Sequence, residues 1–354
     1  MEPRVIPQIR LSQNAIESPH VVILGAGASV AACPKGDRFG RTLPVMRNLV
    51  TTLGLGGLLM DAGVIEGHDD FEALYSSLCT EAQHDELRQS LEERVRCYFE
   101  GVVLPAQVTV YDQLLLCLRE KDMIATFNWD PFLMQAIWRN RHLRRLPEIV
   151  FLHGNVGVGI CVRHHESGYA GGRCSECGGA YQRSPLLYPV GEKNYREDPF
   201  IASQWARLER KLRDAFLVTI FGYSAPASDV NARELLQLAW DQNGSREFCQ
   251  IEVIDIRPGD QIIDSWKSFI VRDHFQTCRS LNESLITKYP RRSCDAFGWA
   301  VLQCDPWSDK PVPRFRNLQR LQKWCQPLID EELGYYERGE ALTRFMRKTG
   351  VGSF

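Results

Sequence analysis

The sequence lacks several features that would place it in a specialised class of protein. It has no uninterrupted apolar stretch of about 18 residues, which argues against a transmembrane helix. Its first residues, MEPRVIPQIRLSQ, lack the apolar run of a signal peptide. Internal repeats and low-complexity tracts are absent from the sequence. We therefore expect a cytoplasmic protein with no membrane partner.

An excess of charge of one sign is also lacking. The 354 residues carry 42 Lys and Arg against 44 Asp and Glu, a formal net charge of −2. Tight binding to nucleic-acid phosphates usually needs a basic excess, so we expect no direct nucleic-acid binding. The apolar share of 44% is enough to bury a sizeable core.

Most of the twelve cysteines are scattered through apolar or helical contexts, which is typical of reduced, buried thiols. One group differs. Cys161-x-x-His164 and Cys174-x-x-Cys177 form two ligand pairs at zinc-ribbon spacing, within a stretch of Gly, Cys and His that has few apolar residues. Because this stretch cannot build its own core, we expect a structural Zn²⁺ to organise it. His165 competes with His164 for the fourth place.

Apolar runs alternate with helical patterns along the chain. Short strands are predicted at 20–24, 123–127, 148–152, 217–221 and 250–254, with helices at 110–119, 131–141, 200–216 and 229–240. Strand–helix–strand crossovers build parallel sheets. The predicted fold class is therefore α/β, a Rossmann-like parallel sheet with helices on both faces, plus a helical insertion and a small zinc-ribbon module.

We expect a single unit over residues 1–354. Its Rossmann-like core comprises 18–44, 106–157 and 184–305, with the helical insertion at 45–105, the zinc module at 158–183 and C-terminal helices at 306–354.

A glycine turn follows the first predicted strand. The sequence GAGAS, Gly25 to Ser29, has two glycines that let the backbone approach a diphosphate, and a helix begins directly after it. Val30 stands where a third glycine is usual in dinucleotide-binding turns. Taken alone, the motif also fits a tight connection between a strand and a helix that binds no dinucleotide.

Polar residues follow the other predicted strands. They are Asn128 and Asp130, His153, Gly222 and Ser224, and Asp255. Ligands of open parallel sheets bind at the carboxyl ends of the strands. Each residue also has a local interpretation: Asn128 or Asp130 caps the next helix, His153 bonds to backbone, and Asp255 forms a turn with Arg257.

In this order, the motifs resemble the sirtuin superfamily, from about Val21 to Asp255. The segments TFNWDPFL and FGYSAPASDVNARELL are closer to its bacterial sirtuin-like branch than to protein deacetylases. CPKGDRFGRTLP departs from the deacetylase loop after the glycine turn, PVGEKNY only faintly echoes the acyl-peptide segment, and Phe127 stands where deacetylases usually carry Gln.

The resemblance implies an NAD hydrolase of anti-phage defence, acting as a homo-oligomer or with a partner ATPase or other defence protein. Alternatives are an NAD-dependent protein deacylase and a non-catalytic NAD or ADP-ribose sensor. Among the site residues, Asn128 would bind the ribose or an attacking water, Asp130 the nicotinamide amide, and His153 would act as general base. The diphosphate would lie on Gly25, Ala26, Gly27 and Ser29, and the adenosine side near Gly222, Ser224 and Asp255; this Asp replaces a more usual Asn.

Overall fold

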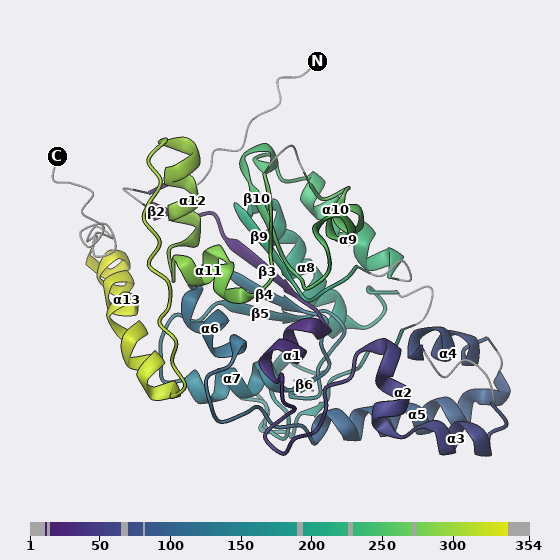
Figure 1. Cartoon of the computed structure of the whole chain (residues 1–354). Coiled ribbons are helices and arrows are strands. Elements are labelled where there is room, and N and C mark those ends of the chain that lie inside the picture. Colours follow the sequence, from purple (N-terminus) through teal and green to yellow (C-terminus); the bar gives the residue numbers. More distant parts are fainter. Residues whose placement is uncertain are drawn as a thin grey trace.

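The computed structural model describes residues 11–12, 15–64, 70–80, 82–189, 194–225, 229–270 and 274–338. Its centre is a six-stranded sheet in the order β11-β10-β9-β3-β4-β5, in which all neighbouring strands are parallel (Figure 1). The bounds are β3 (His20–Leu24), β4 (Met123–Thr126), β5 (Glu148–Phe151), β9 (Leu217–Phe221), β10 (Gln250–Ile254) and β11 (Phe275–Cys278). The predicted α/β class with a parallel sheet is confirmed.

Helices cover both faces of the sheet, and alternate residues of β3 show why. Val21 and Ile23 pack into one core, and Val22 and Leu24 pack into a second core on the opposite face. The first core contains α8 (Pro199–Asp214), α9 (Val230–Asp241), α10 (Gly259–Trp266) and Cys294 of α12 (Ser293–Leu302). The second core contains α1 (Ala26–Ala32), α6 (Val110–Cys117), α7 (Phe132–Asn140) and α11 (Leu285–Lys288). Strands buried on both faces need the continuous apolar runs that the sequence shows.

The helical insertion has a core of its own and projects to one side of the sheet (Figure 1). It consists of α2 (Leu49–Leu53), α3 (Gly56–Asp61), α4 (Phe71–Leu78) and α5 (Asp85–Glu100). Leu59, Phe71 and Leu91 are fully buried among these helices. Phe99 of α5 meets Trp129 edge-on, with ring centroids 5.9 Å apart, so the insertion contacts the sheet beside a predicted site motif.

A small antiparallel sheet in the order β7-β6-β8 forms the predicted zinc module. Its strands are β6 (Val158–Cys161), β7 (Glu166–Tyr169) and β8 (Gln182–Arg183). The remaining elements are β1 (Leu11–Ser12), β2 (Ala15–Ile16) and the short 3-10 turns η1 (Met46–Asn48), η2 (Ala82–His84), η3 (Arg246–Phe248) and η4 (Leu281–Glu283).

The chain closes with the long helix α13 (Leu318–Arg338). Its Glu332 is 1% exposed and accepts hydrogen bonds from the buried guanidinium of Arg291, one of them 2.7 Å long from Nη2 to Oε2. This buried ion pair holds α13 on the core. The helical pattern predicted beyond Arg338 lies outside the described residues.

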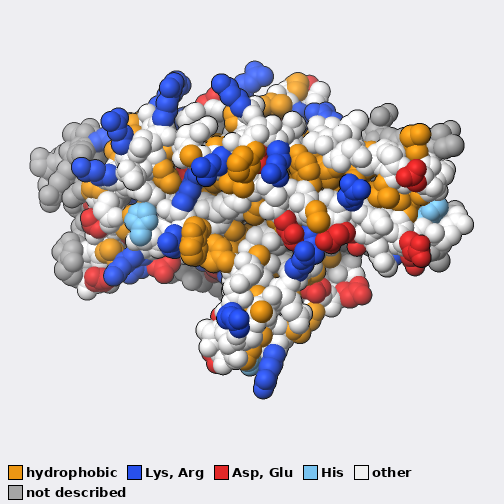
Figure 2. All heavy atoms as spheres, turned by 90° about the horizontal axis from the view of Figure 1, so that it is seen from below, with side chains coloured by type: hydrophobic (Ala, Val, Ile, Leu, Met, Phe, Trp, Pro, Cys, Tyr) orange, Lys and Arg blue, Asp and Glu red, His pale blue; other side chains and the backbone are white. Residues whose placement is uncertain are grey.

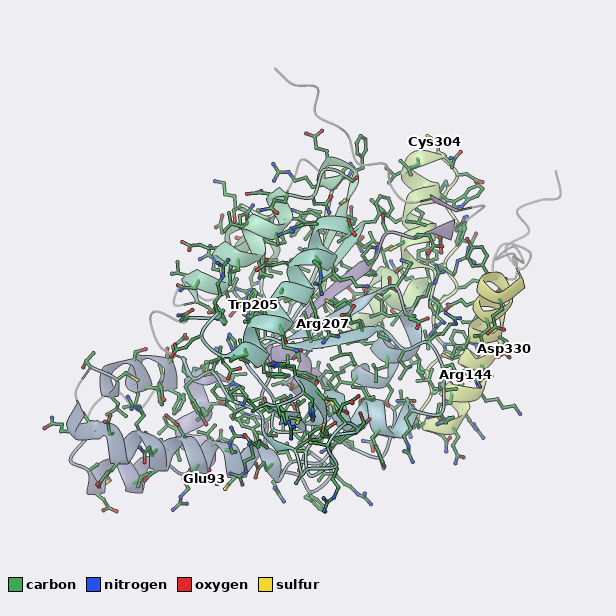
Figure 3. All side chains as sticks on the ribbon, turned by 180° about the vertical axis from the view of Figure 1, so that it is seen from behind. Glu93, Arg144, Trp205, Arg207, Cys304 and Asp330 are labelled. Atoms are coloured by element: carbon green, nitrogen blue, oxygen red, sulfur yellow. The ribbon has the colours of Figure 1, made fainter. Side chains whose placement is uncertain are left out.

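Figure 2 shows basic, acidic and apolar side chains interspersed over one face of the molecule. In the part of the chain that the structure describes, every helix is too short or too polar to span a membrane. Seen from behind in Figure 3, α8 carries Trp205 and Arg207 across the sheet, while Glu93 lies on α5 of the insertion.

Candidate active site

The predicted site residues come from strands that end at one edge of the sheet. Because β3, β4, β5, β9 and β10 run parallel in aligned register, their carboxyl ends meet there. Gly25, Asn128, His153, Gly222 and Asp255 follow those ends directly or within two residues. These turns therefore share one edge of the sheet.

Two glycine turns pack against each other at this edge. The backbone N–H of Gly25 donates to the Phe221 carbonyl at 3.0 Å, and that of Gly27 donates to the Gly222 carbonyl at 2.9 Å. A Cβ on Gly27 would come within 2.8 Å of the Gly222 Cα, and Gly222 itself has φ +64°. Close approach of the two turns therefore requires these glycines independently of any ligand, and two N–H groups of the predicted diphosphate turn are already bonded.

Asn128, Ser29 and Asp130 form one buried hydrogen-bonded group. The amide nitrogen Nδ2 of Asn128 donates to the Gly25 carbonyl and to Ser29 Oγ, each at 2.9 Å. A carbonyl only accepts, so the amide nitrogen must face Gly25 and the amide oxygen Oδ1 must face the other way. Among the described residues, no side chain or backbone group donates to that oxygen.

The carboxyl of Asp130 is buried in the same group. Ser29 Oγ donates to its Oδ2 at 2.6 Å, and the backbone N–H of Phe132 donates to its Oδ1 at 3.2 Å. Burial raises the pKa of Asp130 to about 6, although the Ser29 hydroxyl opposes the shift. Near neutral pH this carboxyl therefore exists in both protonation states.

Two further members of this group were missed by sequence reasoning. Tyr111 of α6 places its hydroxyl 2.7 Å from Ser29 Oγ. Asn155 donates from Nδ2 to the backbone carbonyls of Asn128 at 3.0 Å and Asp130 at 2.7 Å, which holds the two strand ends together. The only signal for Asn155 was its place two residues after His153; Tyr111 carries no signal, since it reads as an apolar helix residue.

His153 belongs to a second buried network. Its Nε2 lies 2.8 Å from the Tyr195 hydroxyl, which donates to Asp229 Oδ1 at 2.8 Å. Tyr223 donates to the other oxygen, Oδ2, at 2.9 Å. Sequence reasoning missed all three partners: Tyr223 lay inside a predicted turn, and Asp229 was only the first residue of the helix predicted at 229–240.

An aromatic cluster holds the His153 ring. The Phe127 ring meets the His153 ring edge-on, with centroids 4.8 Å apart, and stacks on the Tyr223 ring at 4.2 Å. The Tyr195 ring lies parallel to the His153 ring, with centroids 5.6 Å apart. Phe127 thus contributes a ring at the position where deacetylases usually carry a polar Gln. A histidine held in this way has a restricted orientation.

The residues predicted for the adenosine side are less concentrated. Ser224 is exposed. Asp255 accepts from the backbone N–H of Arg257 at 2.9 Å and from its Nη2 at 2.8 Å, so its carboxylate already forms the local turn that the sequence allows.

The zinc-ribbon residues come together as a compact cluster. The ligand atoms of Cys161, His164, Cys174 and Cys177 all lie within 4.8 Å of one another. His164 Nδ1 is 3.2 Å from Cys174 Sγ, and Cys161 Sγ is 3.9 Å from Cys177 Sγ. A zinc tetrahedron with bonds of about 2.3 Å has edges of about 3.8 Å, so this donor set fits Zn²⁺. His164 lies in the cluster, whereas His165 is exposed at the turn, with φ +51°.

No protein-family model matches the sequence, and no curated protein matches it. Among solved structures, a Sir2 homologue in complex with NAD is 16% identical, with a TM-score of 0.39 over 80% of this chain and 90% of that one. Sir2 in complex with the inhibitor EX-527, 2'-O-acetyl-ADP-ribose and a deacetylated p53 peptide is 14% identical, with a TM-score of 0.36 over 81% and 94%.

Proposed function

We propose that this chain is a sirtuin-like NAD glycohydrolase that cleaves the nicotinamide–ribose bond of NAD. The observation that carries the proposal is the grouping of Asn128, Asp130 and His153 after the adjacent strands β4 and β5, beside the glycine turn after β3. Ligands of open parallel sheets bind at this edge. The ordered resemblance of these motifs to sirtuins supports NAD as the ligand.

The chemistry of the bond matches these side chains. Nicotinamide is a cationic leaving group that departs neutral, and the ribose gains positive charge as it leaves. The amide oxygen of Asn128 faces away from Gly25 and would accept a hydrogen bond from a ribose hydroxyl or from water. Asp130 would bind the nicotinamide carboxamide. His153 would take the proton of the attacking water, so that NAD and water yield nicotinamide, ADP-ribose and one proton.

The metal cluster has a structural role in this proposal. Four protein ligands fill a tetrahedral zinc site and leave no open position for substrate. Bound zinc would organise a module that has few apolar residues of its own.

Two features support hydrolysis over deacylation. The loop 33–44 departs from the deacetylase pattern, and Phe127 replaces a polar residue with a ring packed on His153. A role in anti-phage defence follows from the resemblance to the bacterial branch. A homo-oligomer and a partner ATPase remain predictions of that resemblance, and light scattering tests the first.

The test follows NAD by chromatography with purified protein, with and without an acyl-lysine peptide. Asn128→Ala and His153→Ala are expected to lower turnover by about 100-fold or more, while the exposed His142→Ala serves as the matched histidine control and retains it. Turnover that needs the peptide would establish a deacylase instead. NAD binding without turnover in every arm would favour a sensor or an enzyme that needs its partner.

A further inference from the structure

We propose that Asp229 is a positioning residue for His153: acting through the Tyr195 hydroxyl, it selects the tautomer in which Nε2 carries the proton and Nδ1 is the base. The catalytic role of His153 in this inference rests on the proposed function. The choice of tautomer rests on hydrogen-bond chemistry alone.

The directions of the hydrogen bonds at the Tyr195 hydroxyl follow from the chemistry of its partners. Tyr195 has one hydroxyl hydrogen, and a carboxylate oxygen only accepts, so Tyr195 donates that hydrogen to Asp229 Oδ1 at 2.8 Å. The Tyr195 oxygen must then accept from His153 Nε2, also at 2.8 Å. In neutral imidazole the other nitrogen carries the basic lone pair.

Asp229 lies at the start of α9. It is the N-cap residue of α9, and Asp at such a position usually accepts from the backbone of the first helical turn. Here its side chain makes no capping bond; its two oxygens accept from Tyr195 and Tyr223, and the residue is 3% exposed. Its Oδ2 lies 3.9 Å from His153 Nε2, where a negative charge stabilises the protonated imidazole.

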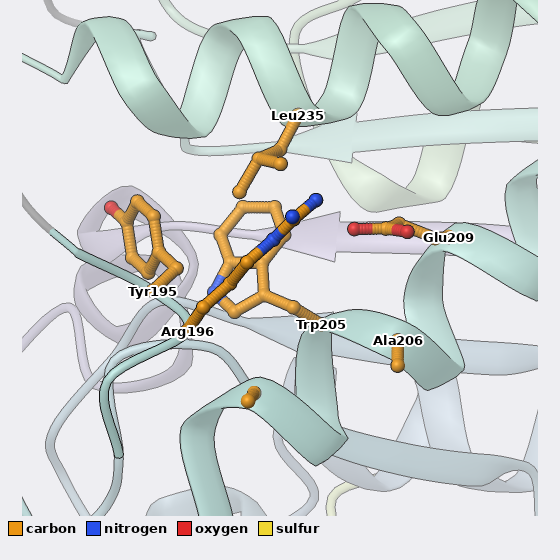
Figure 4. A pocket seen from close by; sticks show the side chains of 7 residues that line it. Tyr195, Arg196, Trp205, Ala206, Glu209 and Leu235 are labelled. Atoms are coloured by element: carbon orange, nitrogen blue, oxygen red, sulfur yellow. The ribbon is translucent and has the colours of Figure 1, made fainter. Parts of the chain in front are cut away.

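The Tyr195 ring is packed against Trp205. The ring centroids of Trp205 and Tyr195 lie 4.6 Å apart. The Nε1 of Trp205 donates to the Leu152 carbonyl at 3.1 Å. Figure 4 shows Tyr195 beside Trp205, with its hydroxyl pointing away from a pocket of about 350 Å³ that both rings line. The hydroxyl that bridges His153 and Asp229 is therefore held in place by the packing of its ring.

Other charges act on this network from the elements around it. Glu72 of α4 and Arg233 of α9 both contribute to the electrostatic environment of Tyr223, with opposite signs. Burial and Asp229 hold the pKa of Tyr195 above its usual range, so its hydroxyl stays protonated as a donor. Among the residues that the structure describes here, Asp229 is the acidic side chain that accepts from both the Tyr195 and the Tyr223 hydroxyls.

The kinetic test compares Asp229→Asn and Tyr195→Phe with wild type in NAD hydrolysis. We expect kcat to fall by about 100-fold or more with KM changed by less than about threefold, and the acid limb of the pH–rate profile to move to lower pH. Tyr289→Phe is the control, since its hydroxyl donates to Asp309 at 2.7 Å outside the site. A raised KM with unchanged kcat would overturn the proposal. Tyr195→Phe keeps the packed ring and removes only the hydroxyl, so it tests the positioning role even if Asp229→Asn does not fold.

A second measurement does not depend on turnover. Long-range ¹H–¹⁵N spectra distinguish the two imidazole tautomers, and the signal of His153 among the eight histidines is identified by its loss in His153→Asn. We expect the Nε2–H tautomer in wild type and a mixture in Tyr195→Phe. An Nδ1–H tautomer in wild type would overturn the positioning role. Absence of NAD hydrolysis together with the Nε2–H tautomer would overturn the proposed function and leave the selection of the tautomer standing.

Discussion

The buried carboxyl of Asp130 predicts a measurable conflict between stability and the proposed activity. Its pKa rises from 3.8 to about 6 on folding, because burial disfavours the charged form. The folded state therefore binds the proton more tightly than the unfolded state, so stability is lost as pH rises from about 4 to about 6. A shift of about two pKa units corresponds to about 3 kcal/mol lost at neutral pH.

Asp130→Asn removes this titration and keeps the shape of the side chain. In urea unfolding, the stability of the variant relative to wild type should increase by about 2 kcal/mol between about pH 4.5 and 7.5. NAD turnover should fall in the same variant. Asp330→Asn is the control, because Asp330 is exposed on α13 (Figure 3) and its replacement should give no pH-dependent difference. A stability difference that stays constant with pH would refute the assignment of the titration to Asp130.

Three further outcomes are expected. Glu332→Gln should destabilise the protein by about 3 kcal/mol in urea unfolding, because Arg291 loses its buried anion; an effect as small as that of an exposed Asp330→Asn would contradict this. Gly222→Ala should cost several kcal/mol, since its Cβ would lie 2.3 Å from the Ala28 nitrogen, whereas Gly171→Ala, also at positive φ but in open space, should cost only about 1 kcal/mol. By metal analysis, His164→Ala should lower bound zinc from about one ion per chain to none, and chelation of wild type should lower its melting temperature.

The local pattern of apolar residues was sufficient to predict the elements whose side chains are all buried. Continuous apolar runs such as HVVIL mark strands buried on both faces, and the structure has that strand at His20–Leu24. The strand Phe275–Cys278 was not predicted. Its residues FQTC mix polar and apolar side chains because it pairs with a neighbour on one side only, at the end of the sheet order.

The sequence by itself determined the parallel α/β class, the glycine turn and the paired zinc ligands, because each depends on spacing within a few residues. Tertiary structure decided which polar residues meet. Tyr195 lies 42 positions beyond His153, and Asp229 a further 34, so no periodicity connects them. It also decided that His164 rather than His165 joins the cluster, since the turn carries the next residue outward. Asp255 pairs locally with Arg257. The interpretation of this segment as a turn allowed that pairing, whereas the interpretation of Asp255 as a ribose-binding residue did not predict it. Hydrogen-bond partners are set by the packing of whole elements, and that information is spread over the chain.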